Sequence, residues 1–138
     1  MTWLFQRTLA ALAIGAVAVS PALALDANGK WTAVSNTAMS ITGDITVSGG
    51  AIKFQNSASI GLKPISGSPR LFAIDPAANP ELLNGNYLCG PDQGPNYVAL
   101  AQVGTTLTLL AFDGPDQPTL AENPLEQDDI CAMFTYAR

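Results

Sequence analysis

MSITGDITVSGGAIKFQ, residues 39–55, alternates apolar and polar side chains on both sides of a Gly-Gly pair. From Met39 to Ser48 every second residue is apolar or glycine, and the residues between are Ser, Thr or Asp. Such a two-residue period indicates a strand with one buried face. Pairing Ser48 with Ala51 aligns the apolar faces, and a two-residue Gly-Gly loop with both φ angles positive fits this register. The stretch therefore predicts a β-hairpin of strands 39–48 and 51–55.

The rest of the chain repeats this pattern of short extended runs separated by Gly, Pro, Asn and Asp. Further strands are predicted at 31–35, 59–65, 70–74, 86–89, 97–103, 106–112 and 131–136. A tight turn at 103–106 makes 97–112 a second hairpin, and one helical turn is expected around 80–83. Pro64 indicates a sheet edge or a strand end, because proline cannot donate to the ladder. The pattern predicts an all-β fold of about eight strands, a small antiparallel β-barrel, with a β-sandwich as the alternative.

The first 24 residues have the layout of a secretory signal peptide. One basic residue, Arg7, precedes an apolar run from Leu9 to Val19, and Ala-Leu-Ala at 22–24 provides small residues for cleavage. The alternative is a membrane anchor, but the apolar run is about half the roughly 20 residues that a spanning helix needs. We therefore expect residues 1–24 to be a cleaved signal peptide and residues 25–138 to form a single β-rich domain.

Cys89 and Cys131 are the only two cysteines. An even pair in an exported chain predicts a disulfide, which by loop entropy stabilises the fold by about 4 kcal/mol. The alternatives are a redox thiol and a metal site. The chain has no CxxC motif and no histidine, so soft metal ligands are too few for a structural zinc site. We expect a structural disulfide that ties the middle of the chain to its last strand, and no metal or cofactor.

Charge is distributed unevenly along the expected mature chain. Residues 81–138 contain eight acidic residues and one basic residue, Arg138, whereas residues 25–80 are nearly neutral. An acidic surface disfavours nucleic acid and anionic membranes, both of which require Lys and Arg. The acidic residues of 113–129 are expected to be solvated loop charges. Calcium is a weaker alternative for this loop, since no EF-hand spacing is present.

No arrangement of catalytic residues is evident. Without histidine the usual triads and the commonest general base are missing, and the paired carboxylates lie in polar loops. The sequence therefore predicts a protein that is not an enzyme. Trp31 is expected either to pack in the core, closing one end of a barrel, or to form an exposed stacking platform.

Two resemblances add to this reading. The Trp31 strand, TAMSITGDI (37–45), FQN (54–56), NGNYLCG (84–90) and the late Cys131 resemble a group of small, uncharacterised secreted bacterial proteins, which implies an exported domain. Tyr87-Leu88-Cys89 and Ser66-Gly67-Ser68-Pro69-Arg70 are similar to motifs of periplasmic inhibitors of c-type lysozyme, which are small β-barrels. The order of the two motifs is reversed here, and Pro69 departs from the pattern of that family.

Together these features predict a periplasmic or secreted, monomeric, non-enzymatic binding module that acts through loops 64–70 and 113–129. An envelope or matrix component and an inhibitor of a secreted hydrolase such as lysozyme are the alternatives. The expected partner is a protein or small ligand, with no nucleic acid and no membrane insertion after signal cleavage. The candidate binding residues are Ser66, Ser68, Arg70, Asp113 and Asp116.

Overall fold

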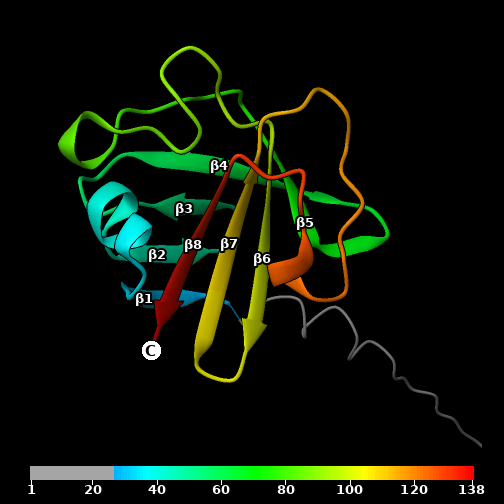
Figure 1. Cartoon of the computed structure of the whole chain (residues 1–138), viewed down its shortest axis with the longest axis horizontal. Coiled ribbons are helices and arrows are strands. Elements are labelled where there is room, and N and C mark those ends of the chain that lie inside the picture. Colours follow the sequence, from blue (N-terminus) through cyan, green and yellow to red (C-terminus); the bar gives the residue numbers. More distant parts are fainter. Residues whose placement is uncertain (1–26) are drawn as a thin grey trace, which may run out of the picture.

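Strands that follow one another in the sequence are hydrogen-bonded neighbours in space, and the last strand returns to the first (Figure 1). This computed structural model describes residues 27–138, so the predicted signal peptide lies outside the described residues. All pairs are antiparallel, and Thr32 opposite Ala137 belongs to the pair that closes the ring. The fold is a closed eight-stranded barrel and not a sandwich. Its strands are β1 (Gly29–Ala33), β2 (Ile45–Ser48), β3 (Ala51–Lys53), β4 (Ser59–Ile65), β5 (Ser68–Ile74), β6 (Tyr97–Val103), β7 (Thr106–Phe112) and β8 (Ala132–Ala137).

The β2–β3 hairpin has the predicted register, with Val47 opposite Ile52 and Ser48 opposite Ala51. The turn itself differs from the expectation, because neither Gly49 nor Gly50 has a positive φ. The Gly50 carbonyl instead accepts the Leu62 N–H at 2.8 Å, which extends the β3–β4 ladder into the turn. The hydrophobic faces therefore set the register here, and the neighbouring strand sets the turn.

Residues 39–44 are not strand, which corrects the prediction of a strand over 39–48. A single π-helical turn, η3 (Ala38–Thr42), closes with the Gly43 N–H on the Ala38 carbonyl, and Gly43 has φ +64°. Ser35 starts the turn by accepting the Ala38 N–H through its hydroxyl. The buried residues are Ala38 and Thr42, whereas the Met39 side chain is 52% exposed. Local hydrogen bonds thus override the two-residue pattern.

Two further expectations are wrong in detail. Residues 86–89 form no strand; the turns there close on each other, with the Asn86 N–H donating to Leu83 and the Leu82 N–H donating to Asn86. The expected helical turn at 80–83 lies later, as the 3₁₀ turn η4 (Leu83–Gly85). The expectation for Pro64 is met in part: it is the last but one residue of β4, next to a register shift between Pro64 and Ile65, and so lies at a strand end and not at a sheet edge. A bulge tolerates a missing N–H as an edge does.

The barrel interior is filled by apolar side chains from all eight strands. Trp31, Ile52, Leu107, Phe134 and Tyr136 are each at most 1% exposed. The Trp31 indole N–H donates to the Ala27 carbonyl at 2.7 Å, and the Arg138 guanidinium stacks 4.0 Å from the ring centroid. This confirms Trp31 as a core residue, since ring and indole nitrogen are both satisfied internally. The interior is a packed core and leaves the functional surface to the connections.

A second apolar cluster lies on the outer face of the barrel wall. Leu71, Ala99, Leu110 and Phe112 form it, and Leu120 and Ile130 pack against them. Segment 113–131 thus runs down the outside of β5–β7, where Figure 1 shows it in orange with the 3₁₀ turn η5 (Pro124–Glu126). None of the helical turns within 27–138 has the length and hydrophobicity of a membrane-spanning helix.

Candidate functional site

Antiparallel topology separates the connections into two groups at opposite ends of the barrel. One end, the turn end, has the tight turns at 49–50, 66–67 and 104–105. The other, the loop end, has the longer connections 34–44, 54–58, 75–96 and 113–131. Successive antiparallel strands reverse direction, so every second connection lies at the same end of the barrel. The long connections alternate with the two-residue turns along the chain, and all of them therefore lie at one end. Long loops on a rigid scaffold usually carry recognition, so the loop end is the candidate site.

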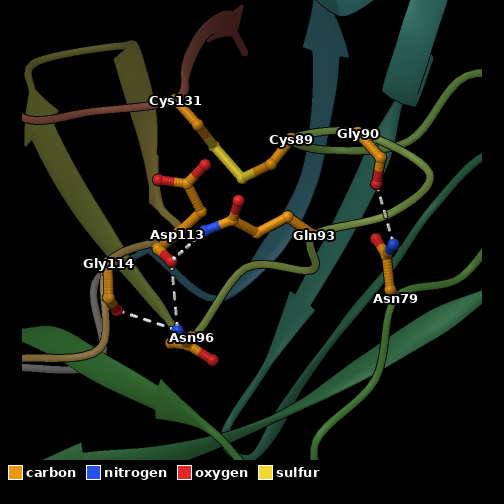
Figure 2. The surroundings of a disulfide bond; sticks show 8 residues. All are labelled: Asn79, Cys89, Gly90, Gln93, Asn96, Asp113, Gly114 and Cys131. Carbon is orange, nitrogen blue, oxygen red and sulfur yellow. Dashed lines mark hydrogen bonds between the residues drawn. A yellow bond between two sulfur atoms is a disulfide. The ribbon is translucent and has the colours of Figure 1, made fainter.

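The disulfide joins the two longest connections at this end. Cys89 lies in 75–96, and Cys131 ends 113–131 directly before β8. Their sulfurs are bonded with a Cα–Cα separation of 5.3 Å, which confirms the predicted pair (Figure 2). The Cys131 N–H also donates to the Ala111 carbonyl at 2.8 Å, so the staple is anchored to β7. One covalent bond therefore ties both loops to the barrel wall.

Amide side chains reinforce the same junction. The Asn96 side chain donates to the carbonyls of Asp113 and Gly114 at 3.2 and 2.8 Å, and the Gln93 side chain donates to the Asp113 carbonyl at 3.0 Å (Figure 2). The Asn79 side chain donates to the Gly90 carbonyl at 2.8 Å. Side-chain amides thus satisfy carbonyls that no ladder reaches, which holds irregular backbone in one conformation.

A groove of about 410 Å³ lies on one side of the disulfide. Its walls are η3, residues 85–91 and the start of β8. The side chains that give it its character are Thr37, Ile41, Tyr87, Pro91 and Met133, none of which is charged. The Thr37 hydroxyl donates to the Met133 carbonyl at 2.9 Å and ties η3 to β8.

A second hollow, of about 500 Å³, lies within segment 113–131 and is acidic. Asp113, Asp116, Asp128 and Asp129 contribute to its lining, which contains no basic residue. Asp116, Asp128 and Asp129 are exposed, as expected for solvated loop charges, whereas Asp113 is half-buried. The Asp113 carboxylate and the two disulfide sulfurs lie within 4.8 Å of one another. The disulfide therefore lies between an uncharged groove and an acidic hollow.

The cluster of Cys89, Cys131 and Asp113 is the one group within residues 27–138 whose ligand atoms are close enough to hold a metal ion. Metal ligation by cysteine requires thiolates. Both sulfurs are bonded to each other, so only the Asp113 carboxylate remains as an anionic ligand. In this oxidised form the cluster is a covalent staple with an adjacent charge.

The remaining predicted site residues lie elsewhere. Ser66 belongs to the β4–β5 turn at the turn end, and Ser68 and Arg70 lie on β5. Arg70 borders a narrow gap beneath 120–127, together with Leu120 and Gln127. The gap has about the volume of one water molecule, so it admits no larger ligand. The structure thus places Asp113 and Asp116 in the candidate site and Ser66 at the opposite end.

Ile41, Tyr87 and Met133, which line the groove, were not among the candidate binding residues, although Tyr87 belongs to the motif similar to that of lysozyme inhibitors. Tyr87 and Met133 each lie two positions from a cysteine of the predicted disulfide. A disulfide brings its flanking residues together, so this spacing was the available signal. Ile41 had no such signal, because the pattern assigned it to a strand.

The one titratable side chain with a clearly shifted pKa in the described part of the chain lies in the core. Burial raises the pKa of the Tyr136 phenol above its ordinary value of 10.0, and the hydrogen bond to Thr42 opposes this in part. The two hydroxyls are 2.7 Å apart. Because Tyr136 is sealed in the interior, this hydrogen bond fixes η3 onto β8 and offers no surface for catalysis.

Comparisons with protein-family models, with curated proteins and with solved structures give no match for this chain.

Proposed function

We propose that this chain is a non-enzymatic binding module that recognises a basic protein surface through the loop end of its barrel. The observation that carries the proposal is the clamp formed by Cys89–Cys131 on two long connections, with an open hollow on each side. Clamped loops lose little conformational entropy on association, which favours recognition. The four carboxylates of the acidic hollow determine the sign of the partner's charge.

The residues present favour binding over catalysis. The chain contains no histidine, and the described cysteines are both consumed in the disulfide. The lining of the acidic hollow has carboxylates, two side-chain amides and the hydroxyl of Thr119, with no Lys, His or free Cys that could activate this hydroxyl. A site that offers shape and charge without an activated group is suited to holding a partner.

The disulfide also bears on location. Disulfides persist in oxidising compartments and are rare in the reducing cytosol. The Cys89–Cys131 bond therefore indicates that the protein functions outside the cytosol. We propose the periplasm or the exterior of a cell, in agreement with the signal-peptide pattern of residues 1–24.

Capture experiments test this proposal. The purified protein, immobilised through a tag after Arg138 at the turn end, is incubated with extracytoplasmic extract and with a purified c-type lysozyme as a defined basic protein. We expect retention of a basic protein that is released by added salt, because screening weakens exposed charge pairs. The triple variant D116N/D128N/D129N removes three carboxylates of the acidic hollow and should lose most of this retention.

The matched control is D75N/E81Q/E122Q, which removes three exposed charges that do not line the acidic hollow. It should retain the partner. Equal loss in both triple variants would mean that the acidic hollow is not special among the charges of the loop end, and it would contradict recognition at the hollow. Retention that is insensitive to salt and to both variants would contradict a basic partner.

Inhibition of a secreted hydrolase is a second candidate, favoured by the same acidic hollow facing a basic enzyme. The motif resemblance supports it less, because Tyr87 and Cys89 line the groove at the loop end whereas Ser66 lies at the turn end. Two motifs at opposite ends of a barrel cannot enter one cleft together. Lysozyme turnover measured with micromolar protein decides the question, and unchanged turnover excludes this candidate.

A further inference from the structure

The groove beside the disulfide is built before any partner arrives. The side chains of Asn84 and Asn86 both donate to the Ser40 carbonyl, at 3.0 and 3.2 Å, and so fix the loop that carries Tyr87 against η3. The Thr37–Met133 hydrogen bond fixes the opposite wall, and the disulfide fixes the far end. A groove held by bonds from three elements requires little rearrangement on binding.

Its chemistry suits an apolar side chain. Ile41, Tyr87 and Met133 line the groove and are half-buried. Ile41 also packs against the barrel core and Met133 against the outer apolar cluster, so part of each of these two side chains is already covered. Within residues 27–138 no hydrogen bond to the Tyr87 hydroxyl occurs, so this group is available to a ligand. The volume of the groove, about 410 Å³, falls within the range of roughly 300–1,000 Å³ that is usual for ligand pockets. An aromatic ring, a methionine and a branched aliphatic side chain together form a surface on which a large apolar side chain packs well.

The neighbouring charge specifies what should flank that side chain. Cys131 lines the groove, and the Asp113 carboxylate lies within 4.8 Å of the Cys131 sulfur. Asp129, two residues before Cys131, belongs to the acidic hollow. A segment that fills the groove thus places its adjacent residues beside carboxylates, which favours Lys or Arg at those positions.

We propose that the groove binds an aromatic or large aliphatic side chain of a partner segment whose neighbouring residues are Lys or Arg. The inference rests on the proposed function and assigns different roles to the groove and to the acidic hollow. The groove receives the anchoring side chain that provides most of the affinity, as buried aromatic anchors commonly do. The acidic hollow selects for positive charge and increases the rate of association.

Three capped synthetic pentapeptides test the assignment: KKWKK, KKSKK and EEWEE. Each is titrated into ¹⁵N-labelled protein, and amide chemical shifts are followed. We expect KKWKK to shift resonances of residues 37–41, 85–91 and 131–134, and to bind about ten-fold or more tightly than KKSKK. EEWEE should bind more weakly than KKWKK by a similar factor, because its charges face carboxylates.

The variant Tyr87→Ala should reduce the KKWKK affinity about ten-fold and leave that of KKSKK unchanged. The matched control Val103→Ser truncates a side chain that is 76% exposed at the turn end, and it should bind like the wild type. Should Tyr87→Ala fail to fold, the comparison of the three peptides on the wild-type protein still decides the matter.

The outcomes separate the two proposals. Equal binding of KKWKK and KKSKK overturns the anchoring role of the groove and leaves a charge-selective loop end intact. Equal binding of KKWKK and EEWEE overturns the requirement for basic flanking residues. KKWKK shifts confined to residues outside the groove overturn the site itself. Absence of KKWKK binding overturns the inference, whereas the capture experiment with the acidic triple variant tests the proposed function separately.

Discussion

Reduction of the Cys89–Cys131 bond removes one covalent link and no side chain, so its effect on stability can be derived from the structure. The cysteines are 42 residues apart in the sequence. Loop-closure entropy for a segment of this length gives about 4 kcal/mol of stabilisation in the oxidised protein, acting mainly through the unfolded state. The hydrogen bonds from Gln93 and Asn96 to the Asp113 carbonyl do not involve the sulfurs, so we expect the native junction to stay closed after reduction. At this chain length the loss corresponds to a decrease of about 16 °C in Tm.

Urea denaturation measures this loss. Trp31 is buried in the barrel and is the only tryptophan of the expected mature chain, so its fluorescence reports unfolding. We expect the reduced wild type and the variant C89A/C131A to lose similar free energies of unfolding, and the reductant to leave the variant unchanged. The m value should rise, because an unlinked unfolded chain exposes more surface. A difference below about 1 kcal/mol between oxidised and reduced wild type would refute the entropy argument.

Three further predictions concern the barrel. Thr42→Val leaves the buried Tyr136 hydroxyl without its partner and should lower the free energy of unfolding, measured by urea denaturation, by about 1–3 kcal/mol. The control is Thr106→Val at a solvent-exposed position, and a smaller loss of stability from Thr42→Val than from this control would contradict the prediction. Because the pKa of Tyr136 is raised in the folded state, folded protein holds a proton that unfolded protein releases above pH 10. Stability should therefore be constant below that pH and fall above it, with a smaller fall in Tyr136→Phe when Tm is followed from pH 8 to 11.5. Gly61→Ala places a Cβ against the Asp75 carbonyl oxygen and should lower stability by about 1–3 kcal/mol, whereas Gly49→Ala, with open space around it, should be nearly neutral by the same thermal assay.

Short extended runs bounded by turn residues predicted most of the barrel strands, and two-residue alternation predicted the register of the first hairpin. The strands at 59–65, 97–103 and 106–112 have the predicted bounds, and the hairpin register around Val47 and Ile52 is as expected. In the hairpin the apolar faces and the neighbouring strands agree with the prediction, although the turn conformation differs from it. The disulfide was predictable for a similar reason, because two cysteines allow only one intramolecular pair.

The failures occur where local turn hydrogen bonds combine with hydrogen bonds from distant residues to determine the backbone. Thr42 belongs to the polar face of the predicted strand, yet it is buried because the Tyr136 hydroxyl satisfies it from β8. Residues 84–86 are fixed by hydrogen bonds from the side-chain amides of Asn84 and Asn86 to the Ser40 carbonyl, which is 44 and 46 positions away in the sequence. No local pattern reports such partners. The groove is formed in part by these segments, so of its lining only the residues that flank the predicted disulfide, such as Tyr87 and Met133, had a signal in the sequence.

Segment 113–131 is packed against the barrel wall, although its composition is that of a solvated loop. Its exposed carboxylates agree with this composition. However, β7 reads LTLLAF over residues 107–112, a nearly continuous apolar run that is typical of a strand buried on both faces. The apolar side chains on the outer face of β7 need a second layer to bury them, and Leu120 and Ile130 of segment 113–131 pack against them. The segment is therefore held at both its disulfide and its apolar contacts, and this fixed position keeps the carboxylates of the acidic hollow beside the groove. Recognition of charge and of an apolar anchor then depends on the same packed segment, so a change such as Leu120→Ser should weaken both without altering either lining.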